Sequence, residues 1–507
     1  MDFLKDTPVL VLGLGESGLA MARWCLRHGA QVRVWDSREN PPQAQALDAA
    51  AVRLSGPLDP ALVAEVKLLL KSPGLAPHDE RVAPLLTAAR ERGLAVMGEL
   101  DLFARALADL KAALGYAPQL LAITGTNGKT TVTAMTALLV ERAGRRVAMA
   151  GNIGPTMLDT LTAMLDEPQD TWAEVWVLEL SSFQLDGVVG FEPSAAAVLN
   201  VTQDHLDWHG SMAAYAAAKA RIFGTQAVMV INRDDALVGA MVPVPVIPKG
   251  RKTPVDAPRQ LSRFSLEAPR QPGDFGIVVE NGMAWLVRAL PADETIKRRK
   301  GDDEEEIHLQ RLMPADALRV RGRHNAANAL AALALASAIG CPLAPMLHGL
   351  REYRGEPHRV EPVGSVGGVE AFDDSKGTNV GATVAALEGL GADIAPGRIV
   401  VILGGDGKGQ DFSPLAAPAA RYVRAVALIG RDAAAIAAAL RGTGVHMETL
   451  ATLPEATAWC FAQAQAGDAV LLSPACASLD MFRNYGHRAE VFVESVRALA
   501  LERGEAA

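Results

Sequence analysis

The sequence has few cysteines and no long apolar run, and both absences narrow the class of protein. Its four cysteines show no C-x-x-C spacing, so neither a zinc site nor a disulfide framework is indicated. No window comes near the ~20 uninterrupted apolar residues of a membrane-spanning helix. The N-terminus also lacks a basic segment followed by a long apolar core. We therefore expect a cytoplasmic protein with no export signal and no stable membrane insertion.

Positive charge is also scarce. The chain carries 49 lysines and arginines against 58 acidic residues, a net charge of −9, and it has no long basic stripe. This argues against a nucleic-acid groove, although small anionic substrates need only local positive charge. Half of the 507 residues are apolar, which is enough to bury about three domains of ~150 residues each.

The segment LLAITGTNGKTTVT at residues 120–133 predicts a phosphate-binding loop. A short apolar strand breaks at two glycines, which let backbone N–H groups converge on an anion before a helix predicted over 134–140. Lys129 adds a full positive charge, and the hydroxyl of Thr130 is placed to hold Mg²⁺. Only two residues separate the glycines, whereas the general G-x-x-x-x-G-K-[ST] frame has four. The loop is therefore a variant nucleotide site.

An earlier glycine-rich turn lies between two predicted strands, at 8–12 and 31–35, the second of which is followed by Asp36. A strand, a glycine turn opening a helix, and an acid after the second strand are typical of dinucleotide folds. This pattern alone leaves three alternatives open for residues 1–98: an NAD site, a site for another nucleotide, or a turn that only packs helix on strand.

Polar residues follow the predicted strands of the middle region. Asn152 follows one strand, Glu179 lies near the end of a second, and His205 follows a third in the motif NVTQDHLD. In open parallel sheets, ligands bind beyond the carboxyl ends of the strands. We expect these residues to gather around one nucleotide, with Glu179 facing Mg²⁺. The alternatives are that Glu179 is a solvent-exposed residue at the edge of the sheet and that His205 has a purely structural role.

Lys219 receives no special role from the residue pattern alone. It shares one face of a predicted helix with Tyr215 and Phe223, at a spacing of four residues. A lysine in such a stripe ordinarily extends its amine to water. The charge-segregated run at 297–306 also has nothing to bury, so we interpret it as a solvent loop without a catalytic role.

The C-terminal region again alternates strands with helices. Three predicted strands end in polar or cationic loops, DDSKGTN at 373–379, GGDGK at 404–408 and SPACAS at 473–478. Such an arrangement is typical of a binding rim. Arg359 precedes this region near the predicted hinge, where it is placed to move onto a phosphate when the domains close.

Nine motifs together resemble the Mur ligase family, from residue 8 to about 495. They are GTNGKTT, SSFQL, NVTQDHLD, AAAKARIF, GRHNAAN, EPHRVE, DDSKGTN, LGGDGKG and SPACASLDMF. The tight GTNGKTT loop is shared with folylpolyglutamate synthetases and indicates only the superfamily. DDSKGTN and SPACASLDMF are similar to the D-glutamate-adding branch, whereas diamino-acid-adding relatives carry Asn-Pro-Arg in place of Asp374, Ser375 and Lys376.

The resemblance implies an α/β fold of three domains. These are a UDP-binding Rossmann-like domain at 1–98, a central P-loop ATPase-like domain with a parallel sheet at 99–355, and a C-terminal Rossmann-like domain at 356–507 for the incoming amino acid. Because the first domain of the family binds UDP, the resemblance favours a UDP site over the NAD site considered above for residues 1–98. The implied reaction is ATP-dependent joining of D-glutamate to UDP-N-acetylmuramoyl-L-alanine through an acyl phosphate in peptidoglycan precursor synthesis, with two Mg²⁺ ions and a monomeric enzyme.

The resemblance also implies roles for individual residues. The UDP-substrate set is Glu16, Ser17, Asp36, Ser37, Arg38, Ser72, Gly74, Asn152 and His205. The ATP set is Gly125, Thr126, Asn127, Gly128, Lys129, Thr130, Thr131, Asn325, Asn328, His358, Arg359, Asp374 and Lys376. The D-glutamate set is Thr378, Lys408, Ser478, Leu479 and Tyr485, with tyrosine where relatives have phenylalanine. The implied metal ligands are Thr130, Glu179, His205 and Lys219 as a carbamate, and the catalytic set is Lys129, Glu179, His205, Lys219 and Arg359.

Three rival functions remain at this point. A folylpolyglutamate synthetase would not need a uridine-binding first domain. An NAD(P)-dependent oxidoreductase built on residues 1–98 would leave the phosphate-binding loop unexplained. A non-enzymatic nucleotide switch would form no product from ATP, D-glutamate and the UDP-sugar.

Overall fold

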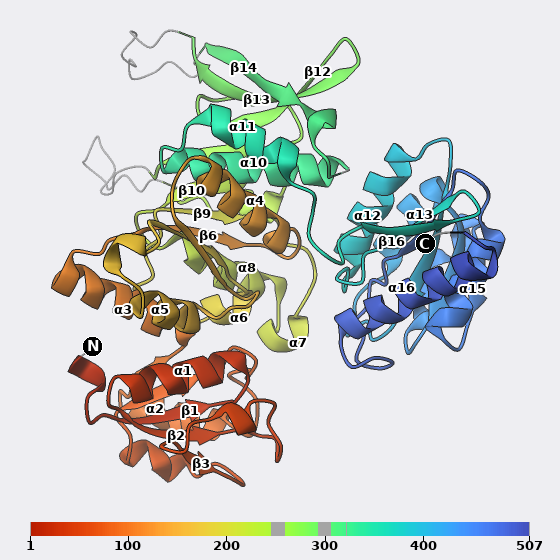
Figure 1. Ribbon diagram of the computed structural model, residues 1–507. Helices are drawn as coiled ribbons and strands as arrows, with labels where there is room; N and C mark the ends of the chain where they lie inside the picture. Colours follow the sequence, from red (N-terminus) through yellow and green to blue (C-terminus); the bar gives the residue numbers. More distant parts are fainter. Residues whose placement is uncertain (1, 245–258, 293–305, 321, 506–507) are drawn as a thin grey trace.

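The computed structural model describes residues 2–244, 259–292, 306–320 and 322–505. Three sheets follow one another along the chain, each with helices on its faces (Figure 1). The predicted three-domain α/β fold is confirmed. Most of the charged run at 297–306 lies outside the described residues. Within the described ranges, no helix is both long and apolar enough to cross a membrane.

The first sheet has five parallel strands in the order β3-β2-β1-β4-β5. Its three inner strands are rich in Val and Leu and largely buried, as in parallel sheets covered on both faces. Helix α1 (Glu16–Arg27) follows the glycine turn after β1 and packs against the central domain. The strands are β1 (Pro8–Leu12), β2 (Gln31–Trp35), β3 (Val52–Leu54), β4 (Leu68–Lys71) and β5 (Val96–Met97).

The turn between β1 and α1 depends on Gly18. A Cβ atom at Gly18 would lie 1.8 Å from the carbonyl oxygen of Gly13, whereas a Cβ at Gly15 would meet no atom within 4 Å. We expect Gly18→Ala to lower the free energy of unfolding by about 3 kcal/mol, because the clash is with backbone. The matched variant Gly15→Ala should cost less than about 1 kcal/mol, the scale of a changed helix cap. Urea unfolding of both variants measures the difference, and equal stabilities would contradict the packing argument.

The central sheet has nine strands in the order β14-β13-β12-β11-β10-β9-β6-β8-β7. Strand β6 (Gln119–Thr124) lies between β8 (Val175–Glu179) and β9 (Ala195–Val198), and all three are parallel. Strands β12 to β14 are antiparallel and form the upper extension in Figure 1. The remaining strands are β7 (Val147–Gly151), β10 (Val228–Asn232), β11 (Leu261–Phe264), β12 (Phe275–Glu280), β13 (Met283–Pro291) and β14 (Ile307–Pro314).

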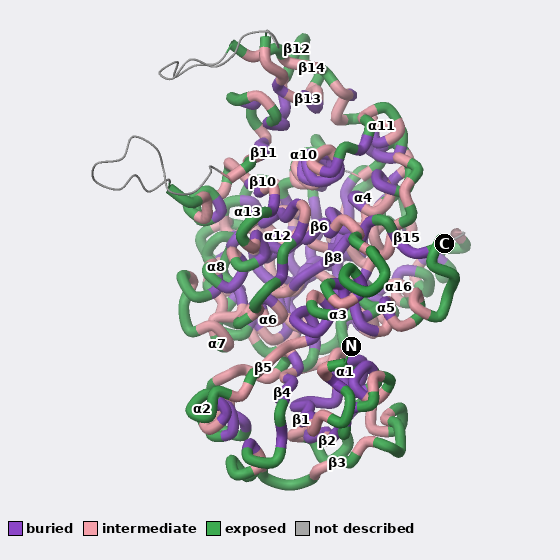
Figure 2. The backbone as a smooth tube through the Cα atoms, turned by 90° about the vertical axis from the view of Figure 1, so that its left-hand side faces the viewer, coloured by how far each residue is buried: buried purple, intermediate pink, exposed green. Residues whose placement is uncertain are grey.

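Alternate residues of β6 point to opposite faces of the central sheet. Leu120 and Ala122 join the core under α3 (Glu99–Leu114) and α5 (Met157–Leu165), whereas Leu121 and Ile123 join the core under α4 (Lys129–Arg142) and α10 (Arg323–Ala338). This is the period of two expected of a strand. Both faces of β6 are therefore buried, and Figure 2 shows the strand within the buried interior of the domain. The phosphate-binding loop consequently starts from a rigid strand.

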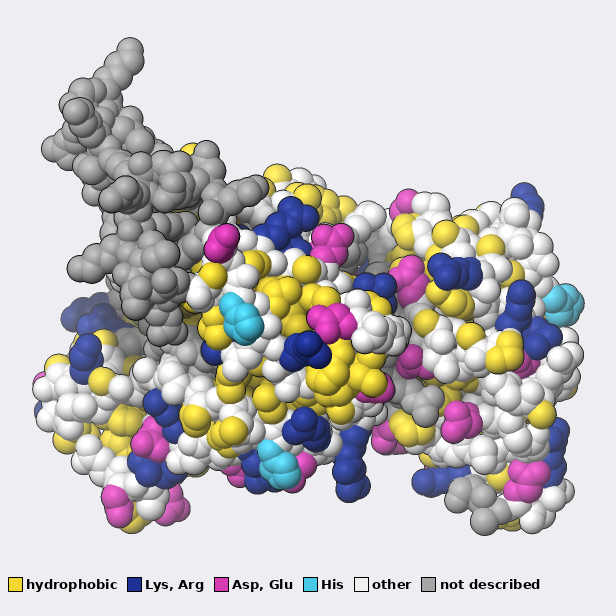
Figure 3. Space-filling model, turned by 90° about the horizontal axis from the view of Figure 1, so that it is seen from above, with side chains coloured by type: hydrophobic (Ala, Val, Ile, Leu, Met, Phe, Trp, Pro, Cys, Tyr) yellow, Lys and Arg dark blue, Asp and Glu magenta, His cyan; other side chains and the backbone are white. Residues whose placement is uncertain are grey.

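The third sheet has the order β15-β16-β20-β17-β18-β19, and only its edge strand β15 runs antiparallel. The strands are β15 (Glu361–Val366), β16 (Val369–Asp373), β17 (Ile399–Gly404), β18 (Val423–Ile429), β19 (His446–Thr449) and β20 (Ala469–Leu472). Helix α12 (Val380–Asp393) covers one face, and α15 (Leu453–Gln463) and α16 (Tyr485–Glu502) cover the other. Seen from above, this domain lies beside the central domain, whose visible face gathers hydrophobic side chains (Figure 3).

Candidate active site

The phosphate-binding loop (residues 125–131) joins β6 to α4. Helix α4 begins at Lys129, five residues before the predicted start, because the last residues of the motif already form its first turn. Gly128 has a φ of +84°, and a Cβ there would lie 2.8 Å from Asn328 Oδ1. Both the backbone conformation and this close approach require glycine. The N-terminus of α4, with its partial positive charge, therefore lies at the loop.

Side chains of the central domain hold the loop in shape. Lys129 Nζ donates to the carbonyl oxygens of Gly125 (2.9 Å) and Thr126 (2.8 Å). Asn200, which follows β9, accepts from the Asn127 amide at 2.8 Å and donates to its carbonyl at 3.1 Å. Desolvation of this partly buried amine lowers the pKa of Lys129. These contacts therefore fix the shape of the loop.

Two cations from the C-terminal domain converge on the same loop. Arg359 Nη2 and Lys376 Nζ donate to Thr130 Oγ1 at 3.0 and 3.3 Å. Burial, followed by the charge of Arg359, lowers the pKa of Lys376. His358 and Val360, on either side of Arg359, have φ values of +64° and +48°, a strained conformation that is concentrated at functional sites. His358 Nδ1 pairs with Asp373 Oδ2 at 2.7 Å, which anchors the strained turn.

Glu179 fits a divalent cation. Its side chain is 1% exposed, and Asn152 Nδ2 donates to its Oε1 at 2.8 Å. Its Oε2 is buried and has no hydrogen-bond partner. A buried carboxylate oxygen without a partner is costly, and carboxylate and hydroxyl oxygens are the ligands that Mg²⁺ prefers. Glu179 at the end of β8 and Thr130 at the start of α4 therefore suit the metal that the resemblance implies.

Lys219 does not extend to water, so that expectation from the helical stripe was wrong. It is 1% exposed, and its Nζ donates to the carbonyl oxygen of Gly125 at 2.8 Å. The reason is that α8 (Met212–Ala220) packs its lysine face against the end of β6. Burial, followed by the charge of Lys129, lowers the pKa of Lys219 well below its usual value. This shift favours the neutral, nucleophilic form of the buried amine.

His205 lies beside Asp204, with 3.5 Å between its Nε2 and Asp204 Oδ2. Burial lowers the pKa of His205, and nearby lysines reinforce the shift against the opposing effect of Asp204. A neutral imidazole is able to accept a proton or to bind a metal. The φ of +53° at His205 turns the chain into the short helix α7 (Leu206–His209).

The predicted UDP-substrate residues, except His205, line one cavity of about 590 Å³ between the first and central domains. Asp36 Oδ2 accepts from the Leu14 amide at 2.6 Å and pairs with Arg38. Burial opposes the charge on Asp36, but these hydrogen bonds outweigh it and hold its pKa at about 2. Arg81 also lines this cavity; the sequence analysis missed it because no motif surrounds it.

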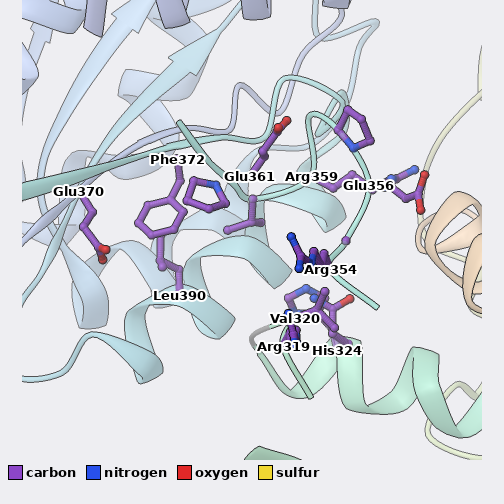
Figure 4. A pocket seen from close by; sticks show the side chains of 15 residues that line it. Arg319, Val320, His324, Arg354, Glu356, Arg359, Glu361, Glu370, Phe372 and Leu390 are labelled. Carbon is purple, nitrogen blue, oxygen red and sulfur yellow. The ribbon is translucent and has the colours of Figure 1, made fainter. Parts of the chain in front are cut away.

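The predicted ATP residues lie at the boundary of the central and C-terminal domains. A cavity of about 400 Å³ has His324 and Asn325 on the side of α10 and Arg359 and Phe372 on the other (Figure 4). An adjoining cavity shares several of these residues and reaches the loop at Asn127, Gly128 and Thr131, together with Asn328 and Asp374. The structure therefore brings together groups that lie roughly 200 residues apart in the sequence.

The predicted D-glutamate residues are only partly gathered. The loops after β17 and β20 pair through Asp406 and Ala477, with N···O distances of 3.0 and 2.8 Å, which brings Lys408 and Ser478 to one rim. The Tyr485 ring lies 5.8 Å from Lys376 Nζ. Leu479 is 73% exposed, whereas its neighbour Ser478 is buried.

Arg488 organises this rim and was missed by the sequence analysis. It is 1% exposed and donates to the carbonyl oxygens of Ser375 (2.7 Å) and Cys476 (3.1 Å). One guanidinium thus ties the DDSKGTN loop to the SPACAS loop. Its position within α16, outside any motif, gave no signal in the sequence.

Comparison with known families gives three matches along the chain. Residues 7–98 match the Mur ligase MurD-like N-terminal domain, residues 123–250 the Mur ligase middle domain, and residues 358–476 the Mur ligase glutamate ligase domain. The order of the three matches is that of the three sheets.

Similar proteins extend over the whole chain. A protein of Albidiferax ferrireducens named UDP-N-acetylmuramoylalanine--D-glutamate ligase is 61% identical, with 100% of this chain and 99% of that protein covered. A protein of Burkholderia pseudomallei with the same name is 59% identical, with 98% of each covered. The solved structure of a MurF ligase from Thermotoga maritima with ADP is 15% identical and aligns with a TM-score of 0.58 over 99% of this chain and 100% of its own.

Proposed function

Since this chain belongs to the Mur ligase family, we propose that it joins D-glutamate to UDP-N-acetylmuramoyl-L-alanine at the expense of ATP, a step of peptidoglycan precursor synthesis. Full-length relatives at 59–61% identity carry the name of this ligase. The observation that carries the proposal is the convergence of Arg359 and Lys376 on Thr130 of the phosphate-binding loop. Cations from the C-terminal domain meet the loop where a phosphoryl group would be transferred.

In the first step, an oxygen of the alanyl carboxylate bonds to the γ-phosphorus of ATP. The bond between that phosphorus and the bridging oxygen breaks, which gives an acyl phosphate and ADP. Lys129, Arg359 and Lys376 place positive charge around the transferring oxygens, so catalysis is mainly positioning and electrostatic stabilisation. When bound, two Mg²⁺ ions would add charge neutralisation at the same oxygens.

In the second step, the amine of D-glutamate attacks the acyl carbon. The amine loses one proton, the tetrahedral intermediate collapses, and phosphate leaves as the amide forms. We assign the proton to His205, because its lowered pKa keeps the imidazole neutral and able to accept it. The rim that carries Thr378, Lys408 and Ser478 supplies the amino-acid site, and the cavity beside Asp36 supplies the UDP site.

Lys219 is proposed to act as a carbamate. The neutral form of its amine would add to CO₂ with loss of one proton, which places an anion at the end of the lysine side chain. Thr130, Glu179 and this carbamate would then hold the two Mg²⁺ ions, while His205 is left free of metal to accept the proton. We further propose a monomer that works in the cytoplasm, where ATP is supplied, divided into domains at 1–98, 99–355 and 356–507.

Phosphate release measured with UDP-N-acetylmuramoyl-L-alanine and four amino acids tests the proposal. We expect release with D-glutamate and only background release with L-glutamate, L-lysine or diaminopimelate. Release that depends on folate and L-glutamate would instead assign a folylpolyglutamate synthetase. Absence of D-glutamate-dependent release would overturn the proposed function.

A further inference from the structure

Asn379 joins the C-terminal domain to the phosphate-binding loop and has no role in the mechanism described so far. It is the residue before α12 and is 5% exposed. Its Oδ1 accepts from the amide of Ala382 at 2.9 Å, which caps the start of the helix. A cap of this kind explains the oxygen of the side chain but leaves its amide nitrogen unexplained.

The amide nitrogen reaches across the domain boundary. Asn379 Nδ2 donates to Asn127 Oδ1 at 3.0 Å, and Asn127 Nδ2 donates back to Asn379 Oδ1 at 3.2 Å. Two side-chain amides thus form a reciprocal pair between residues that are 252 positions apart. Gly381, in the first turn of α12, allows this approach, since a Cβ there would come within 3.1 Å of Asn127 Nδ2.

The same nitrogen also reaches the residue that orients His205. Asn379 Nδ2 lies 3.4 Å from Asp204 Oδ2. Asp204 accepts from the amide of His205 at 2.9 Å through its other oxygen and faces the imidazole at 3.5 Å. Asn379 is therefore in contact with both sides of the reaction centre, the phosphate-binding loop and the His205 turn.

We propose that Asn379 is a positioning residue that holds the C-terminal domain in register with the phosphate-binding loop and with Asp204. The inference rests on the proposed ligase function. Because Arg359, Lys376 and Thr378 move with the same domain, the amide pair fixes where their side chains stand relative to Thr130. An interaction that aligns the reacting groups, and whose partners are Asn127 and Asp204 and not the D-glutamate residues, should change kcat more than the KM for D-glutamate.

Two substitutions separate the amide pair from the helix cap. Asn379→Ser keeps an oxygen that caps α12 and removes the contacts with Asn127 and Asp204. We expect kcat to fall about tenfold, because both hydrogen bonds with Asn127 and the longer one with Asp204 are lost, with the KM for D-glutamate within about twofold. Asn379→Asp also keeps the cap but sets a carboxylate against Asp204, and we expect a loss of about a hundredfold.

Gln410→Ala is the matched control. Gln410 Oε1 accepts from the Val380 amide at 3.0 Å, so this variant weakens the start of the same helix without touching Asn127 or Asp204. We expect its kcat to stay within about twofold of wild type. Calorimetric unfolding of all variants checks that each is folded.

A double-mutant cycle with Asn127→Ser decides the proposal. If the amides act as a pair, the double variant loses no more activity than the more impaired single variant. If the activity losses of the two single variants multiply in the double variant, the positioning role is overturned. A change confined to the KM for D-glutamate would overturn it as well. X-ray scattering gives a readout independent of activity, in which Asn379→Asp should be more extended than wild type and equal dimensions would count against the role. An inactive wild-type protein would refute the ligase function instead.

Discussion

Replacement of Lys129 by alanine is expected to lower kcat by about a thousandfold, the scale of losing one preorganised electrostatic group at a transition state. The lysine is partly buried, and its Nζ is held by two carbonyl oxygens of the phosphate-binding loop. Its charge is therefore held in place before the phosphoryl group moves. Steady-state phosphate release with saturating ATP, UDP-substrate and D-glutamate measures the loss.

A lysine elsewhere in the same domain serves as the control for Lys129. Lys111 lies on the exposed side of α3, and Lys111→Ala should keep wild-type kcat within about twofold. Near-normal turnover of Lys129→Ala would remove the phosphate-binding loop from the mechanism.

Lys219→Ala is expected to be as damaging, with loss of about a thousandfold in kcat, but to respond to added anions. The substitution removes the proposed carbamate and leaves a space at the end of β6, where Lys219 Nζ lay 2.8 Å from the Gly125 carbonyl. A small carboxylic acid such as formate or acetate would place an anion there and restore part of the activity. Bicarbonate would not, because alanine has no amine to carbamylate.

The rescue experiment has two controls. Lys219→Arg should remain inactive with either additive, because the guanidinium fills the space and stays protonated. Lys129→Ala should also gain nothing from formate or acetate, since it lacks a cation and not an anion. Indifference of Lys219→Ala to every carboxylic acid, or its recovery in bicarbonate, would contradict the carbamate.

The sequence predicted those parts of the fold that depend on local patterns. β1 and β2 match their predicted ranges, because runs of Val and Leu bounded by glycine or polar residues are typical of buried parallel strands. It missed β14 and β15, which carry polar residues and lie at sheet edges, where one face meets water. It also placed the start of α4 five residues late, because the loop motif does not look helical.

The site residues that belong to a sequence motif could be predicted. Those that are placed only by packing between elements could not. The motif of the phosphate-binding loop identifies Lys129 and Thr130 directly. The burial of Lys219 results from the contact of α8 with β6, and the residue spacing within the helix does not predict that contact. Arg488 and Asn379 act across 113 and 252 positions. Contacts of that kind arise only when the domains are assembled.

The most direct test follows the oxygen atoms of the reaction. The proposed chemistry transfers one oxygen of the alanyl carboxylate to phosphate when the acyl phosphate is broken down. With UDP-N-acetylmuramoyl-L-alanine labelled with ¹⁸O in that carboxylate, mass spectrometry of the released phosphate should find one ¹⁸O atom per molecule formed with D-glutamate. Unlabelled phosphate, formed together with the amide, would contradict activation of the carboxylate by ATP.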